Sequence, residues 1–114
     1  MKISTLNTKT YPLACDEALA TIQKEIEILS LSDCKVLKII HGYGSKGVGG
    51  VIKSELNILL KDLCKQGKIL DFVANEKFIE PTAKYKRFTK LYPELILDSD
   101  LQNQNPGITL IFLN

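Results

Sequence analysis

Apolar side chains form short, nearly continuous runs in some segments of this chain and recur every third or fourth residue in others. The short runs predict strands and the recurring pattern predicts helices. The predicted strands are residues 3–10, 35–40, 68–74 and 107–113, and the predicted helices run from Cys15 or Asp16 to Leu29 and from Val51 to Cys64. This βαβαββ order predicts an α/β fold, a two-layer sandwich with a four-stranded mixed sheet.

The connections predict the strand directions. Helices join the first three strands, so we expect these strands to run parallel with right-handed crossovers. The last strand follows a long insert, residues 75–104, and should be antiparallel to its neighbour. Four of the five residues from Val36 to Ile40 are apolar, which predicts a central strand covered on both faces. Within the insert, a short helix is expected around Thr82 to Leu91.

The composition is that of an ordinary globular domain. The 114 residues are 45% hydrophobic and 25% charged, which suits a single domain, residues 1–114. No apolar stretch approaches the roughly 20 residues of a membrane-spanning helix, and the first residues lack the apolar block of a signal peptide. We therefore expect a cytoplasmic protein with no membrane contact. The net charge of +2 neither requires nor excludes a nucleic-acid partner.

The three cysteines, Cys15, Cys34 and Cys64, are widely spaced and form no Cys-x-x-Cys pair. This spacing argues against a zinc site or a disulfide framework, so we expect reduced and mostly buried thiols. We predict no metal site and no cofactor. Nothing in the sequence fixes the oligomeric state, and a monomer is compatible with it.

The segment after the second predicted strand is the strongest candidate for a functional site. It begins at His41, the only histidine, and contains five of the seven glycines. A strand, a glycine-rich loop and a helix in this order bring backbone N–H groups close to an anion. We expect a phosphate-binding loop for a polynucleotide. Its predicted contact residues are Gly42, Tyr43, Gly44, Ser45, Lys46, Gly47, Gly49 and Gly50.

Other interpretations of the same glycines stay open. Gly42-x-Gly44-x-x-Gly47 matches the dinucleotide-binding fingerprint, and Asp71, near the end of the next predicted strand, would then bind a ribose. A Walker-type loop is set aside because the Gly-Lys-Ser or Gly-Lys-Thr ending is missing. The loop could also merely connect two elements, although ordering five glycines is entropically costly.

His41 has two possible roles. It stands at the carboxyl end of a strand, where open α/β sheets bind ligands. It could contact a phosphate or act as a general base. It could equally be a structural hydrogen-bonding group, and the sequence does not separate these roles.

A second candidate contact lies in the insert, where basic and aromatic residues are interleaved. Such a mixture can hold a sugar-phosphate backbone and stack on unpaired bases. It is also typical of a solvated helix face whose aromatic residues pack inward. The basic residues concerned are Lys84, Lys86, Arg87 and Lys90.

Two motifs, in their order along the chain, resemble the Smr domain, the small MutS-related domain that occurs alone and at the end of MutS2-type proteins. They are the strand-His-Gly-x-Gly segment Ile39–Gly44 and the Gly-x-Thr-x-x-x-Leu segment Gly107–Leu113; Asp16–Leu19 fits the start of the family's first helix. The resemblance covers nearly the whole chain outside the insert. It implies a fold similar to the C-terminal domain of translation initiation factor 3, DNA or RNA binding, and in several members endonuclease cleavage.

The chain departs from this family at its first strand. Cleaving members carry Leu-Asp-Leu-His there, whereas residues 8–11 read Thr-Lys-Thr-Tyr, and sliding the register to residues 5–8 supplies neither Asp nor His. Only His41 is left for proton transfer. We therefore predict a nucleic-acid-binding module of Smr type that contacts phosphates through the His-Gly-x-Gly loop. The alternatives are an endonuclease that uses His41, a nucleotide or small-ligand site at the glycine-rich loop, and an interaction domain with an exposed apolar patch.

Overall fold

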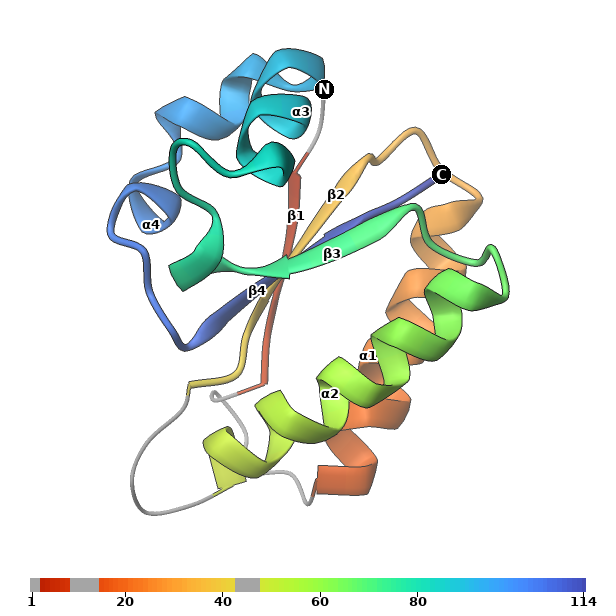
Figure 1. Cartoon of the computed structure of the whole chain (residues 1–114). Helices are drawn as coiled ribbons and strands as arrows, with labels where there is room; N and C mark the ends of the chain where they lie inside the picture. Colours follow the sequence, from red (N-terminus) through yellow and green to blue (C-terminus); the bar gives the residue numbers. More distant parts are fainter. Residues whose placement is uncertain (1–2, 9–14, 43–47) are drawn as a thin grey trace.

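The computed structural model describes residues 3–8, 15–42 and 48–114, and the secondary structure of this part follows the predicted order (Figure 1). The strands are β1 (Ile3–Asn7), β2 (Val36–Ile40), β3 (Asp71–Ala74) and β4 (Ile108–Phe112). The α-helices are α1 (Cys15–Ser30), α2 (Val48–Lys65), α3 (Ala83–Leu91) and α4 (Ser99–Gln102). The insert also contains two short 3-10 helices, η1 (Asn75–Lys77) and η2 (Pro93–Leu97). The predicted βαβαββ order is confirmed.

The four strands form one mixed sheet in the order β1-β2-β4-β3. β1 and β2 are parallel, and β4 lies between β2 and β3, antiparallel to both. β1, β2 and β3 therefore run in one direction, as their helical connections predict, and the antiparallel direction of the last strand is also confirmed. β2 is a central strand with nearly every residue buried, as its apolar sequence indicates.

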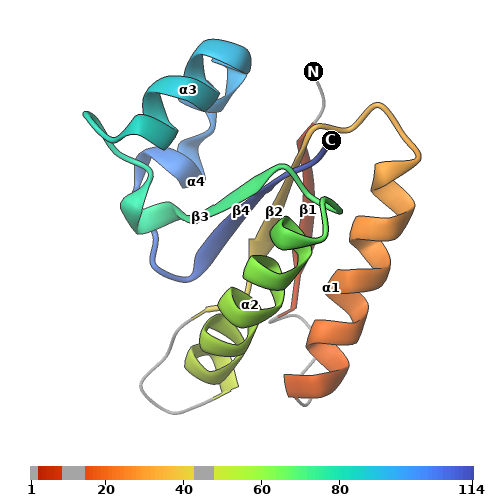
Figure 2. The ribbon, with the colours of Figure 1, turned by 45° about the vertical axis from the view of Figure 1, so that its right-hand side comes forward.

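Helices α1 and α2 cover one face of the sheet and lie side by side in both views (Figures 1 and 2). Their inward positions recur every three or four residues, as the sequence pattern predicts. The core that they form with the sheet is mostly aliphatic. Its large buried residues are Ile22 and Ile26 from α1, Leu56, Leu60 and Leu63 from α2, and Leu37, Ile39 and Ile111 from the sheet.

The insert covers the opposite face of the sheet (Figure 2). The expected two layers are present as α1 and α2 against the sheet, but α3, η2 and α4 add a third layer. Aromatic packing explains this difference. Phe88 of α3 is fully buried and stacks on Phe112 of β4 with ring centroids 3.6 Å apart, and Phe78 lies 6.1 Å from the same Phe112 ring. The helix expected around residues 82–91 is confirmed as α3, which the Thr82 hydroxyl caps.

A partly buried cluster of charges lies between β2 and α4. Lys38, in the middle of β2, is only 6% exposed, and its ammonium donates hydrogen bonds to Asp98 at 3.0 Å and Asp100 at 2.8 Å. The Asp98 carboxylate also accepts from backbone N–H groups in the first turn of α4. Burial acts to lower the pKa of Lys38, but the hydrogen bonds and charges of Asp100 and Asp98 outweigh burial and raise it. The lysine therefore stays charged and attaches the insert to the sheet.

Three predicted boundaries shift by a few residues. β3 begins at Asp71 instead of Lys68, because the Lys68 N–H closes α2 by donating to the Leu63 carbonyl at 2.9 Å. Gly67, with φ of +74°, makes this closure possible. β1 ends at Asn7. α2 begins at Val48, three residues before the predicted start.

Candidate nucleic-acid interface

His41 directly follows β2, at the carboxyl end of that strand. This end of the sheet lies at the same end of the molecule as the first turn of α2 (Figure 1). The His41 side chain is buried, with 2% of its surface exposed. By strand alternation it shares the face of Leu37 and Ile39, the face covered by α1 and α2. Strand alternation therefore places the single histidine inside the fold.

Both ring nitrogens of His41 have hydrogen-bond partners. Nδ1 contacts the carbonyl oxygen of Gly42, and Nε2 lies 2.9 Å from the hydroxyl oxygen of Thr109 on β4. Because a carbonyl oxygen only accepts, we assign the proton to Nδ1, and Nε2 then accepts from the Thr109 hydroxyl. In this tautomer neither ring nitrogen is free to take a proton from a ligand.

The surroundings of His41 favour the neutral imidazole. Burial lowers its pKa, the hydrogen bond to the Gly42 carbonyl raises it, and the positive charge of Lys53 lowers it; the net shift is downward. A neutral ring held by two hydrogen bonds fixes the backbone at the end of β2. Of the two roles considered for His41, the geometry favours the structural one.

Two glycines allow the backbones to meet beside His41. The Gly107 carbonyl accepts hydrogen bonds from the N–H groups of His41 and Gly42, at 2.9 and 3.0 Å. A Cβ atom on Gly107 would lie 2.9 Å from the Cα of Gly42, too close for any real contact. Gly42 itself has φ of +70°, a conformation that favours glycine. A side chain at Gly107 would clash with Gly42, and the φ of Gly42 favours glycine.

These contacts join the two motifs that carry the family resemblance. The His-Gly motif follows β2, the Gly-x-Thr motif begins at β4, and the His41–Thr109 and Gly42–Gly107 hydrogen bonds connect them. The two motifs lie more than 60 residues apart in the sequence, and nothing in their spacing indicates this contact. Gly107 and Thr109 are therefore site residues that sequence reasoning named only as part of a pattern.

The remaining predicted contacts of the loop fall into two groups. Tyr43, Gly44, Ser45, Lys46 and Gly47 lie outside the described residues. Gly49 and Gly50 do not belong to the loop, because they lie in the first turn of α2. As parts of a helix N-terminus, both residues still present backbone N–H groups to an anion.

Sequence reasoning missed Lys53, a lysine whose charge acts on His41. Lys53 lies on α2, forms an ion pair with Glu76 of η1, and lowers the pKa of His41 through its charge. Its side chain is 19% exposed. The available signal is its spacing, because Lys53 precedes Leu56 by three residues and Leu60 by seven. That spacing puts a lysine on the inward face of the helix, where a charge needs a partner.

The structure separates the basic residues of the insert into two kinds. Lys84 is engaged in the fold: its ammonium lies 3.1 Å from the Asp71 carboxylate and donates to the Phe72 carbonyl at 2.7 Å. Lys86, Arg87 and Lys90 lie exposed on the outer face of α3. The aromatic residues interleaved with them pack inward, with Phe88 fully buried, so Phe88 is not available to stack on a base.

The basic face of α3 and the His41 region lie at opposite ends of the molecule. Both views place α3 at the top, whereas the end of β2 and the start of α2 lie at the bottom (Figures 1 and 2). Asp71 is also remote from His41, because it is the first residue of β3, which runs parallel to β2. The expectation that Asp71 stands near the end of its strand is wrong, and the dinucleotide interpretation loses its ribose ligand.

Comparison of the chain with protein-family models, with curated proteins and with solved structures gives no match. In the part of the chain that the structure describes, no helix combines the length and apolarity needed to cross a membrane. Within the same residues, His, Cys, Asp and Glu side chains nowhere gather in threes that could hold a metal ion. The candidate interface therefore rests on its own geometry.

Proposed function

We propose that this chain is a nucleic-acid-binding module of Smr type, which contacts the phosphate backbone through the segment from His41 to Gly50. One observation carries the proposal. The buried His41 ring and the Gly107 carbonyl hold Gly42 at the carboxyl end of β2, at the end of the molecule where α2 begins. Backbone N–H groups at the start of an 18-residue helix attract anions because they are unpaired and carry the positive end of the helix dipole.

Two lysines are candidates to supply charge to this interface. Lys46 is the cation of the loop itself, and Lys53 lies about one turn into α2. Lys53 is already paired with the carboxylate of Glu76. A bound phosphate therefore competes with Glu76, which makes Glu76 a negative determinant of affinity.

The outer face of α3 is a second contact in this proposal, separate from the first. Lys86, Arg87 and Lys90 can each meet a phosphate without disturbing the fold, since all three are exposed. Because α3 lies at the other end of the molecule, these residues add charge for a long polynucleotide and add nothing for a short one. We do not extend the proposal to cleavage, because both ring nitrogens of His41 are engaged.

The test is a salt titration of binding to single-stranded and double-stranded DNA and RNA. Each phosphate contact contributes a slope of about −0.9 for duplex DNA, or about −0.7 for single strands, to the plot of log affinity against log salt. Lys46→Met should reduce the slope by about one contact. Lys24→Met, which removes an exposed lysine from α1, should leave the slope unchanged. Absence of binding at low salt, or equal slopes for the two variants, would overturn the proposal.

Glu76→Gln tests the competition at Lys53. Removing this carboxylate frees the ammonium, so the affinity for nucleic acid should rise about two- to fivefold, the range expected for a partly exposed ion pair. Lys53→Met should lower the affinity and abolish the gain from Glu76→Gln. A gain that persists in the double variant would mean that Glu76 acts through general charge and not through Lys53.

A further inference from the structure

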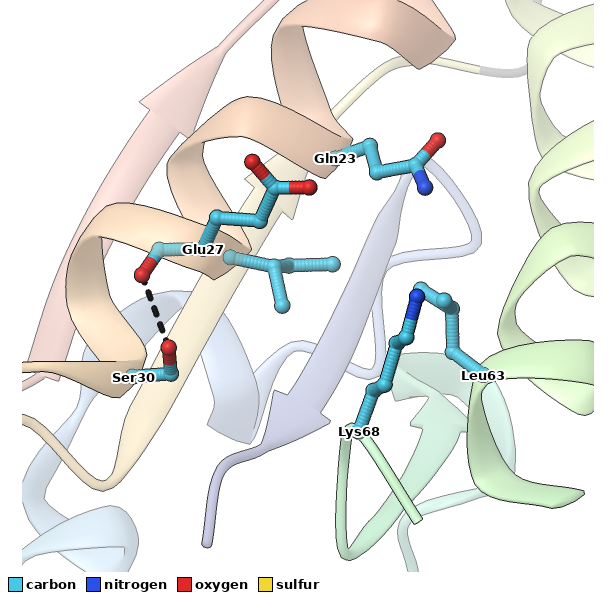
Figure 3. Close-up of a pocket in the computed structure, with 6 residues that line it drawn as sticks. Gln23, Glu27, Ser30, Leu63 and Lys68 are labelled. Atoms are coloured by element: carbon cyan, nitrogen blue, oxygen red, sulfur yellow. Dashed lines mark hydrogen bonds between the residues drawn. The ribbon is translucent and has the colours of Figure 1, made fainter. Parts of the chain in front are cut away.

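A pocket of about 270 Å³ opens between the C-terminal halves of α1 and α2, at the end of these helices remote from His41 (Figure 3). Its floor is apolar, because Ile26 and Leu63 are 3% and 2% exposed. Its walls carry polar groups from both elements. The lining residues are Gln23, Ile26, Glu27, Ser30, Leu63 and Lys68.

Regular backbone structure fixes the positions from which these side chains extend. The α1 residues that line the pocket are spaced by three, four and seven positions from Gln23, so they form one face of the helix. On the other side, the hydrogen bond from the Lys68 N–H to the Leu63 carbonyl ends α2 and keeps Lys68 beside Leu63. The backbone and the apolar floor of the pocket are therefore in place before any ligand arrives, whereas the exposed Glu27 and Lys68 side chains are ordered by the ligand.

Two of the polar groups on the walls are charged, with opposite signs, and they lie on opposite walls. Figure 3 shows the Glu27 carboxylate and the Gln23 amide on the α1 side and the Lys68 side chain on the opposite wall. Over the residues that the structure describes, Glu27 and Lys68 form no ion pair with each other or with any other side chain. An anion and a cation thus flank an apolar floor, each without a partner.

We infer that this pocket binds a small aliphatic zwitterion, of the class of free α-amino acids with a branched hydrocarbon side chain. The ligand ammonium meets the Glu27 carboxylate with the Gln23 amide oxygen beside it, the ligand carboxylate meets the Lys68 ammonium, and the hydrocarbon lies on Ile26 and Leu63. A water molecule takes about 30 Å³ in the liquid, so the pocket holds roughly ten non-hydrogen atoms, the size of leucine. A ligand with only one charge would leave either Glu27 or Lys68 without an opposite charge.

An NMR titration with L-leucine tests this inference independently of nucleic-acid binding. We expect saturable shifts at the backbone amides of Gln23, Glu27, Leu63 and Lys68, with a dissociation constant on the order of 10 mM for a ligand of this size. N-acetyl-leucine, which lacks the ammonium, and leucinamide, which lacks the carboxylate, should each bind about two- to fivefold more weakly.

Two variants identify the charges responsible. Glu27→Gln should abolish the preference for leucine over N-acetyl-leucine, and Lys68→Met should abolish the preference over leucinamide. Glu17→Gln and Lys61→Met are matched controls, because they remove exposed charges of the same helices that do not line the pocket. The same spectra report whether each variant is folded. Absence of saturable shifts, or equal shifts with all three ligands, would overturn the inference.

Discussion

The two faces of the sheet bury polar groups of different kinds. The face under α1 and α2 is mostly aliphatic and holds the neutral pair of His41 and Thr109. The face under the insert mixes aliphatic residues with three buried phenylalanines, and it holds the charged Lys38 with two aspartates. Two long helices with periodic apolar residues can cover a face of the sheet through many similar contacts. The insert consists of short helices, so it needs specific contacts to stay attached to the sheet. We therefore expect the insert face to depend on a few individual side chains.

Phe88→Ala should produce the largest loss of stability. Phe88 is fully buried and stacks on Phe112, so its removal leaves a large cavity on the insert face, and the free energy of unfolding should fall by about 3–5 kcal/mol. Urea denaturation measures this change. Leu91→Ala is the matched control on α3, because Leu91 is 53% exposed and should cost less than about 1 kcal/mol. A similar loss for both variants would show that α3 is not attached through Phe88.

Sequence periodicity predicts one face of the sheet much better than the other. The inward residues of α1 and α2, the parallel strands and the antiparallel last strand all follow from local pattern and connection rules. The third layer does not, because its main contacts join residues far apart in the chain. Phe88 and Phe112 are 24 positions apart, and Lys38 and Asp98 are 60 apart. No window of sequence shows that these residues meet.

The candidate site also has a part that the local sequence predicts and a part that depends on distant contacts. Glycine-rich spacing after a strand identifies Gly42 and its neighbours, since the conformational need for glycine is local. The protonation and role of His41 depend on Thr109 and Lys53, which come from other elements. The sequence therefore locates the site but leaves the function of its histidine open, and the three-dimensional contacts favour a structural role.

Lys38→Met tests the charged attachment of the insert. The change removes a buried cation from between Asp98 and Asp100, and it leaves Asp98 mostly buried without its partner. We expect the free energy of unfolding to fall by about 2–4 kcal/mol, close to the loss seen when one partner of a buried ion pair is removed. Chemical denaturation measures the loss, with Lys24→Met on α1 as the exposed control.

A second substitution shows whether Lys38→Met is destabilising because it leaves a charge unpaired or because it changes the packing. Lys38→Met combined with Asp98→Asn removes the unpaired charge while keeping a side-chain oxygen to cap α4. The double variant should recover part of the stability, because a neutral amide costs less to bury than a carboxylate. If the double variant is less stable than Lys38→Met alone, the carboxylate is needed for reasons other than Lys38.

The two faces should lose stability at opposite ends of the pH range. The pKa of His41 is lowered in the fold, so below about pH 6.5 the unfolded chain takes up a proton that the folded chain does not, and stability falls. The pKa of Lys38 is raised, so above about pH 10.4 the unfolded chain loses a proton that the folded chain keeps, and stability again falls. Each group changes the free energy of unfolding by at most about 1.4 kcal/mol per pH unit.

Single substitutions show which residue causes the fall in stability at low pH and which causes the fall at high pH. His41→Gln should be less stable than the wild-type chain at neutral pH by about 1–3 kcal/mol, because a buried Thr109 hydroxyl loses its partner. The difference in free energy of unfolding between the wild-type chain and His41→Gln should become smaller below pH 6.5. The corresponding difference for Lys38→Met should become smaller above about pH 10.4. Thermal unfolding across pH measures both. Differences independent of pH would mean that neither residue differs in pKa between folded and unfolded chains.

The smallest expected effect separates two lysines on α3 that differ only in what they contact. Lys84→Met removes the bonds to Asp71 and Phe72, but the side chain is 44% exposed, so the loss should be about 0.5–1 kcal/mol. Lys86→Met should change stability by less than about 0.5 kcal/mol. Nucleic-acid binding should show the reverse order, since only Lys86 is free to meet a phosphate. A fall in the salt slope for Lys84→Met alone would mean that its contacts with β3 break when nucleic acid binds.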